Sequence, residues 1–200
     1  VPYFQTGSRV QILTSLVKVL PDLRVTIPLK AGGGYDVANY AASQNAINID
    51  LAAGVVQGGS DVGSDTLIGV EAIVGSNASD TYDASQFGFL SGQANKIDAR
   101  FGLYNSFEGR GGDDVILGNG VTRATYGQAS AGVWVSLIEG TAKDLSDYSN
   151  NTNLDAARVG IDTLSGIYSI RGSNYGDVLI GGKRESDYLE LYEGRAGDDS

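Results

Sequence analysis

The chain has 200 residues but no cysteine, no histidine and no methionine, and only 3 prolines. Without cysteine it has neither disulfides nor thiolate chemistry. Without histidine it lacks the usual general base at neutral pH and the commonest transition-metal ligand. A serine–histidine hydrolase is therefore excluded within these residues.

Basic side chains are scarce as well. The 14 lysines and arginines stand against 24 aspartates and glutamates, so the net charge is −10. A nucleic-acid partner needs a basic face against its phosphates, whereas this balance fits cation binding or simple solubility. No signal peptide is visible, and the longest apolar-leaning segment, residues 10–20, is too short to cross a bilayer.

Glycine, by contrast, is abundant, with 29 residues, and 42% of the chain is hydrophobic. That hydrophobic content is enough for a buried core. An excess of glycine without matching proline indicates many tight turns rather than a disordered linker.

One glycine-dense stretch recurs along the chain. Residues 107–118 read FEGRGGDDVILG, residues 192–199 read YEGRAGDD, and a looser copy at residues 29–36 reads LKAGGGYD. Glycine-rich turns allow positive φ and can point carbonyl oxygens inward, and the closing aspartate adds a charged oxygen. Because Ca²⁺ prefers six to eight oxygen ligands, the recurring turn predicts calcium binding.

This pattern resembles the RTX, or haemolysin-type, calcium-binding repeats of secreted bacterial proteins. The resemblance covers about residues 29–200. It implies an all-β fold, a right-handed parallel β-roll or β-solenoid with apolar side chains inside and calcium ions in the turns. Arg110 and Arg195 depart from the pattern at the second glycine position, where we expect them to shield neighbouring carboxylates.

The candidate metal ligands all belong to such turns or to their degenerate variants. They are Gly109, Gly111, Asp113, Asp114, Gly194 and Asp199 in the best copies, Asp36 in the early copy, Asp80, Gly172 and Asp177 in weaker variants, and Asp65 and Asp162 in a G-x-D remnant. The spacing of 15 residues from Asp65 to Asp80 is not a multiple of nine, so we expect isolated calcium sites rather than a ladder. The alternative is ordinary turns in which aspartate bonds its own backbone.

Two further features of the sequence bear on catalysis or ligand binding. Asp113 and Asp114 are adjacent, so in a strand they point to opposite faces and make a poor acid–base pair. Trp134 is expected to point away from Val133 and Val135, as a sugar-stacking platform or as a surface or interface aromatic. No catalytic residues are therefore assigned, and we do not expect this chain to be an enzyme.

Most of the chain consists of two long, imperfect copies. Residues 40–54 align with 126–140 at an offset of 86, and residues 63–80 align with 160–177 at an offset of 97. The difference indicates an insertion at residues 141–158, polar enough to be an exposed loop. We divide the chain into a junction segment (1–30), a first long β-roll repeat (31–106), a second (107–191) and the start of a third (192–200).

The N-terminal segment differs from these copies. Apolar residues within 8–20 recur with helical spacing, Ser8 is a suitable N-cap and Pro21 would end the helix, so a short helix is expected. Residues 25–29 alternate like a strand. We interpret residues 1–30 as a cap or junction and expect almost no helix after residue 30.

The preferred interpretation is a calcium-binding structural or interaction module of a large secreted RTX-like protein, such as an adhesin or surface-layer component. It would fold on binding calcium outside a bacterial cell. Expected partners are calcium ions, neighbouring repeats and a cell-surface or polysaccharide partner, with self-association through open strand edges.

Two alternatives stay open. One is a β-roll module attached to a secreted protease, lipase or polysaccharide epimerase, and the other is a β-helical enzyme acting on polysaccharide. The chain starts without methionine and stops inside a repeat, so we expect it to be a piece of a longer protein.

Overall fold

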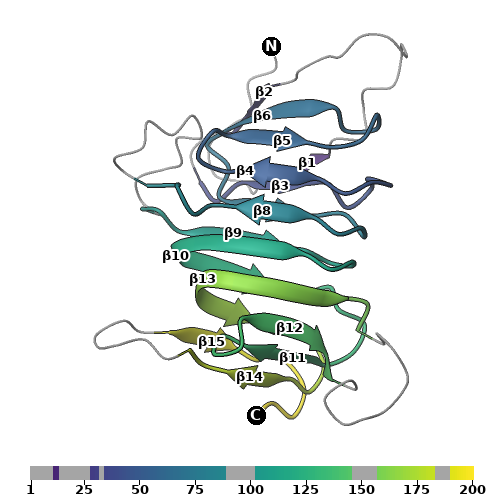
Figure 1. Cartoon of the computed structure of the whole chain (residues 1–200), viewed down its shortest axis with the longest axis vertical. Coiled ribbons are helices and arrows are strands. Elements are labelled where there is room, and N and C mark those ends of the chain that lie inside the picture. The colour runs from purple at the N-terminus through teal and green to yellow at the C-terminus, as the bar shows by residue number, and fades with distance from the viewer. Residues whose placement is uncertain (1–10, 14–27, 32–33, 89–101, 146–156, 183–189) are drawn as a thin grey trace.

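The computed structural model describes residues 11–13, 28–31, 34–88, 102–145, 157–182 and 190–200. These residues are essentially all-β, as predicted, and their strands stack along the long axis of the molecule (Figure 1). The strands are β1 (Gln11–Leu13), β2 (Pro28–Lys30), β3 (Val37–Asn39), β4 (Asn48–Asp50), β5 (Val55–Gln57), β6 (Ser64–Ile68), β7 (Ala72–Val74), β8 (Thr81–Asp83), β9 (Asn105–Glu108), β10 (Val115–Thr125), β11 (Val133–Ser136), β12 (Thr141–Asp144), β13 (Ile161–Arg171), β14 (Val178–Ile180) and β15 (Leu191–Glu193).

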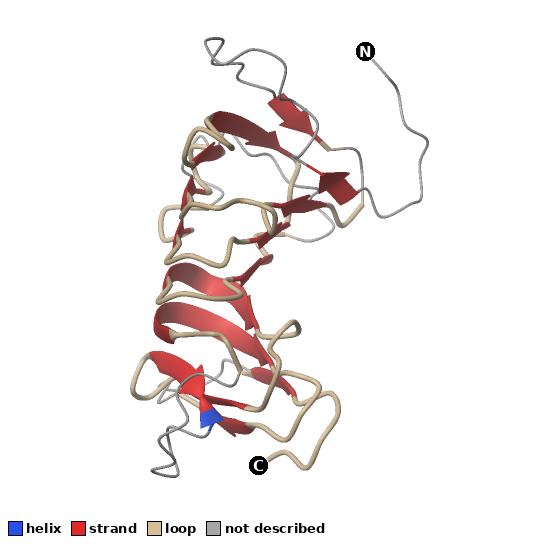
Figure 2. Ribbon diagram, turned by 90° about the vertical axis from the view of Figure 1, so that its right-hand side faces the viewer, coloured by secondary structure: helices blue, strands red, loops and turns tan. Residues whose placement is uncertain are grey.

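Strand pairing arranges them in two rows that share the long strands β10 and β13. The first row runs β2-β6-β5-β4-β8-β10-β13-β12-β11-β14, and the second runs β1-β3-β7-β9-β10-β13-β15. The N-terminal part of β10 pairs with β8, and its C-terminal part pairs with β9. Both long strands curve from one row into the other (Figure 2), with Gly120 at φ 90° and Gly166 at φ 65° in the bends.

The sheet is mixed and not closed. Every pairing in the second row is parallel, but β5 and β12 of the first row run antiparallel to both neighbours. Each follows a tight turn with a left-handed glycine, Gly54 at φ 65° and Gly140 at φ 66°. The expected right-handed parallel β-roll therefore stays a prediction, while the all-β class is confirmed.

The helix expected over residues 8–20 is not supported. Gln11–Leu13 form β1, which pairs in parallel with β3. A short isolated helix is marginal in water, whereas a segment beside an open strand edge gains interstrand hydrogen bonds. The rest of that span lies outside the described residues, as does most of the strand expected over 25–29, where β2 begins at Pro28.

The strands repeat in two matching sets. β4, β5, β6 and β8 of the first set have the same pairing as β11, β12, the start of β13, and β14 of the second. β12 is thus the counterpart of β5, so the first residues of the expected exposed loop at 141–158 form a strand. The extra length follows β12, and residues 146–156 lie outside the described part of the chain.

The core lies between the two rows, because alternate side chains of both rows point inward. Tyr82 of the first row stacks on Phe107 of the second, with ring centroids 4.8 Å apart and an interplanar angle of 14°. Ile73, Ile116 and Ile170 are also fully buried. No helix in the described part of the chain has the length and apolar character needed to cross a membrane.

Candidate metal centre

Four turns follow strands of the second row and have the same arrangement. They span residues 75–80, 109–114, 172–177 and 194–199, and each begins with glycine and ends with aspartate. A Cβ on the first glycine would lie only 1.7 Å from a carboxylate oxygen of Asp114 in the turn that starts at Gly109, and 2.1 to 2.3 Å from the corresponding oxygen in the other three. The closing aspartate therefore folds back across its own turn, into space that only glycine leaves open.

These carboxylates link successive turns of the chain. The backbone N–H of Ile47 donates to Asp80 Oδ1 (2.8 Å), that of Asp80 donates to Asp114 Oδ1 (2.7 Å), and that of Asp114 donates to Asp162 Oδ1 (2.9 Å). We call Asp80, Asp114 and Asp162 the aspartate column. Its carboxylates accept hydrogen bonds from backbone N–H groups that lie just before the first residues of the strands. These N–H groups would otherwise be buried without acceptors.

The second half of the chain builds a shorter version of the same arrangement. Val133, the counterpart of Ile47, donates its N–H to Asp177 Oδ1 (2.8 Å), and Asp177 donates its own to Asp199 Oδ1 (3.0 Å). Asp177 is buried, whereas Asp199 lies in an exposed turn. Of the predicted ligands, Gly172, Asp177, Gly194 and Asp199 thus form one group and Asp80, Gly109, Asp114 and Asp162 another.

Two of the turns carry serine after the first glycine. Asp80 accepts hydrogen bonds from Ser76 N (2.7 Å) and Ser76 Oγ (2.8 Å) in addition to Ile47 N. Asp177 is held in the same way by Ser173 N and Ser173 Oγ, both at 2.7 Å. In these serine turns the protein itself donates hydrogen bonds to both oxygens of the carboxylate. The carboxylate therefore does not need a bound cation.

The other two turns carry arginine at this position. Arg110 and Arg195 adopt φ of 77° and 82°, the left-handed region that favours glycine. Arg110 Nε donates to Asn77 Oδ1 (3.2 Å) and Arg195 Nη1 donates to Gly127 O (3.0 Å). Within the described residues neither forms an ion pair with an aspartate. Burial raises the pKa of Glu108, and the charges of both arginines lower it, so the carboxylate that they shield is Glu108.

Asp114, in an arginine turn, has the least satisfied carboxylate of the column. It is 1% exposed, and while Oδ1 accepts from Asp80 N, Oδ2 has no hydrogen-bond partner. Burial, followed by the charges of Asp162, Asp80 and Asp113, raises the pKa of Asp114 to about 9. At neutral pH this carboxyl group must therefore hold a proton or lie beside a cation.

The surroundings of Asp114 offer backbone oxygens as well. A Cβ on Gly111 would meet the carbonyl oxygen of Arg158 at 3.1 Å, and one on Gly160 would meet the carbonyl oxygen of Gly112 at 2.2 Å. Adjacent turns thus stack backbone to backbone around the glycines. No group of three or more acidic, histidine or cysteine side chains suited to a metal ion occurs in the described ranges, so any ion here would rely on carbonyls as well as on Asp114.

Asp113 and Asp114 differ in environment, as expected for neighbours on opposite faces. Asp113 is exposed; its N–H donates to Ser79 Oγ (2.9 Å), and its Oδ1 accepts from Ile161 N (2.8 Å). It therefore ties three successive segments together at the edge of the stack. Its charge contributes to the raised pKa of Asp114.

Asp65 and Asp162 have a role that the sequence pattern did not reveal. Tyr40 donates its hydroxyl to Asp65 Oδ2 (3.1 Å), and Tyr126 donates its hydroxyl to Asp162 Oδ2 (3.0 Å). All four side chains are buried, and burial raises the pKa of Asp65 and of both tyrosines. The signal was present in the sequence, since Tyr40 aligns with Tyr126.

Asp36 lies apart from the other candidates. It follows β2 of the first row and precedes β3 of the second, so its turn joins the rows in the opposite sense to the four turns above. Asp36 N donates to Glu71 Oε2 (2.8 Å), and both side chains are buried. The early copy is thus not equivalent to the other two in position, and Glu71, which is buried beside it, was not anticipated.

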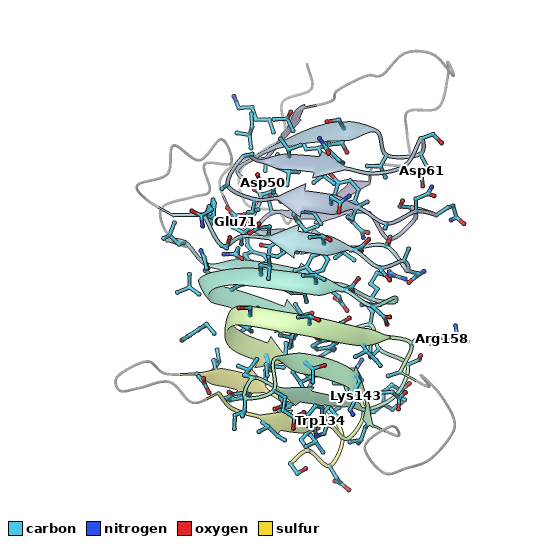
Figure 3. The ribbon with its side chains drawn as sticks, in the orientation of Figure 1. Asp50, Asp61, Glu71, Trp134, Lys143 and Arg158 are labelled. Carbon is cyan, nitrogen blue, oxygen red and sulfur yellow. The ribbon has the colours of Figure 1, made fainter. Side chains whose placement is uncertain are left out.

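Trp134 is not a surface aromatic. It is only 2% exposed, and the Lys143 ammonium lies 5.1 Å from its ring centroid (Figure 3). The two residues are register partners on β11 and β12, so the lysine stem can cover the indole. A sugar-stacking role, which requires an exposed ring, is therefore not supported.

Comparison of the chain with known protein families finds no match, and comparison with curated protein sequences finds none either. The similarity to RTX repeats therefore rests on the turns described above.

Proposed function

We propose that this chain is a calcium-stabilised structural or interaction module of a large secreted bacterial protein, with one principal ion site at residues 109–114. The observation that carries the proposal is Asp114 Oδ2, a buried carboxylate oxygen without a hydrogen-bond donor in a glycine-dense turn. Calcium would supply the positive charge that this carboxylate lacks. Asp114 and backbone carbonyls of the neighbouring turns would hold the ion.

Calcium would act here by coupling to folding. Asp80, Asp114 and Asp162 are buried in one column, and their mutual repulsion and desolvation oppose folding while they are charged. Weak sites, with dissociation constants of about 10⁻⁴ to 10⁻³ M, are filled outside cells and empty in the cytosol. We therefore place the folded module in the extracellular space or at the cell surface, with the right-handed β-roll as its proposed architecture.

The serine turns lower the number of calcium ions that we expect the chain to bind. Because Ser76 and Ser173 already supply donors to Asp80 and Asp177, we expect these turns to stay free of calcium. Of the two remaining turns, the one at 109–114 buries a carboxylate oxygen without a donor, so the proposed stoichiometry is close to one ion for the described part of the chain. An adhesive or surface-layer role remains part of the proposal, because elongated stacks of this kind provide extended surfaces.

A calcium titration tests the proposal. Thermal unfolding followed by far-ultraviolet circular dichroism should shift to higher temperature in millimolar calcium but not in magnesium, and calorimetry should give about one site. Asp114→Asn should remove the calcium response and should raise stability in chelator, because it removes a carboxyl group that must take up a proton on folding. Asp198→Asn makes the same change at an exposed position and should leave the calcium response intact. Equal stability in chelator and in calcium would overturn the proposal.

A further inference from the structure

The outer side of the first row differs between the two halves of the chain. In the first half, the register neighbours on β6, β5, β4 and β8 are Ser64, Gln57, Asn48 and Thr81. In the second half, the residues at the same register positions on β13, β12, β11 and β14 are Ile161, Lys143, Trp134 and Val178. Four polar residues are thus replaced by three apolar residues and a lysine.

One of these apolar residues is strongly exposed: Ile161 is 57% exposed, whereas Trp134 is 2% exposed and Val178 is half-buried. Val115, on the shared strand β10 between the halves, is 36% exposed. Trp134 lies beneath Lys143 and supports it from below. We call Val115, Lys143 and Ile161 the apolar–basic surface. Exposed apolar side chains beside a lysine on one face of a sheet can form part of a contact surface.

The first half carries an acidic pair on the same row. Asp50 of β4 and Asp83 of β8 are register neighbours on adjacent parallel strands. Asp50 also lines a hollow with Asn48, Ala53, Val55 and Gln57. Two like charges side by side on a sheet are unfavourable, so this acidic pair would gain from a nearby cation. Figure 3 shows Asp50 at β4 and Lys143 further along the same stack.

We propose that two copies of this chain associate face to face and antiparallel through the first row. The apolar–basic surface of each molecule then lies on the acidic pair, Asp50 and Asp83, of the other, and Val115 lies near the centre. Because acidic and basic patches occur on one row of the same chain, a two-fold axis makes both contacts at once and closes the dimer.

The size of this face indicates a weak complex. The ten strands of the first row, spaced by about 4.8 Å, extend roughly 40 Å, and strands of this length are on the order of 13 Å long, so the face covers about 500 Å² per molecule. About 1,000 Å² in total is at the low end for specific interfaces. A dissociation constant in the micromolar range is therefore expected.

Sedimentation equilibrium of the 200-residue chain tests this dimer. The unmodified chain should show a monomer–dimer equilibrium at micromolar concentrations, and Lys143→Glu or Ile161→Asp should weaken it at least tenfold. Leu191→Asp, at a residue 43% exposed on β15 of the second row, is the matched control and should dimerise normally. A chain that stays monomeric up to about 100 μM, or a dimer weakened only by Leu191→Asp, would overturn the proposal.

A charge exchange makes the test specific for the two-fold arrangement. Lys143→Glu alone and Asp50→Lys alone should each be monomeric, because like charges then meet in both contacts of the dimer. Mixing the two variants should restore association, since both contacts of the mixed dimer pair a lysine with an acidic residue. Circular dichroism confirms that each variant is folded. Failure of the mixture to associate, while each variant is folded, would overturn the assignment.

Discussion

The serine turns and the arginine turns share the same first glycine and closing aspartate, but they treat the buried carboxylate in different ways. In the serine turn at 75–80, Ser76 supplies a hydroxyl and an N–H, and both oxygens of Asp80 are satisfied. In the arginine turn at 109–114, the side chain of Arg110 turns away to Asn77, and Asp114 Oδ2 is left without a donor. The backbone N–H of the residue after the first glycine thus makes the difference, because Ser76 N reaches Asp80 Oδ2, whereas Arg110, at φ 77°, leaves Asp114 Oδ2 without a donor.

The buried environment of Asp114 is completed by a distant segment of the chain. The segment that leads into β13 covers the turn at 109–114 and brings Asp162 against Asp114. Burial, followed by the charge of Asp162 from that segment and by the charges of Asp80 and Asp113, raises the pKa of Asp114 to about 9.

The largest effect is expected from Gly109→Ala. Its Cβ would overlap Asp114 Oδ2 at 1.7 Å, so either the turn opens or the aspartate column breaks. We expect a loss of at least about 3 kcal/mol in the free energy of unfolding, measured in urea. Gly88→Ala, where a Cβ would meet nothing within 4 Å, should change stability by less than about 0.5 kcal/mol. Similar losses for both would contradict the packed turn.

The pH dependence of stability should follow Asp114 in the absence of calcium. Its pKa is raised on folding to about 9, so the folded state binds the proton more tightly, and stability falls as pH rises toward 9. The slope from this group is at most about 1.4 kcal/mol per pH unit. Unfolding at pH 5, 6.5 and 8 in chelator measures it. Asp114→Asn should flatten the profile, and an unchanged slope in that variant would assign the dependence to another group.

Tyr126→Phe removes the hydroxyl that donates to Asp162 Oδ2 and leaves a buried carboxylate oxygen without this donor. We expect a loss of about 2 kcal/mol in urea unfolding. Tyr40→Phe is the matched change in the first half and should cost less, because Asp65 does not neighbour Asp114 in the column. A larger cost for Tyr40→Phe would argue against coupling between Asp162 and Asp114.

Ser76→Ala removes the hydroxyl donor to Asp80 Oδ1, so about 1 kcal/mol of stability should disappear in urea unfolding. Because Ile47 N and Ser76 N still donate to the two oxygens of Asp80, the variant should not gain a response to calcium. Ser85→Ala, at an exposed position, serves as control and should be neutral in both measurements.

The smallest effect is expected at Arg195. Its φ of 82° favours glycine, so Arg195→Gly relieves local backbone strain. The same change removes the hydrogen bond to Gly127 O and increases the conformational entropy of the unfolded chain, and both of these effects lower stability. These terms nearly cancel, and the change in unfolding free energy should stay within about 1 kcal/mol. A loss well above that would show that the arginine contact, and not the backbone conformation, dominates at this position.

The sequence by itself determined the local features. Glycine-dense turns between short apolar runs specify an all-β chain, and the alignment of residues 40–54 with 126–140 anticipates matching strands such as β4 and β11. Local patterning was less reliable at the N terminus, where β1 pairs with β3 in place of the expected helix, because a distant strand edge outweighs helical spacing in a short segment. The side chain of Trp134 points to the outer face of the sheet, as the alternation predicts. It is nevertheless buried, because a side chain of the neighbouring strand β12 covers it.

Only the tertiary structure decided what the aspartates contact. Asp114 accepts from Asp80, 34 residues away, and Asp162 accepts from Asp114, 48 residues away, so no local motif specifies these partners. Carboxylates in such turns can bind an ion or backbone N–H groups, since both satisfy the same oxygens. Which one they bind depends on the donors that adjacent strands bring to them, and those donors are placed by the stacking of the two rows.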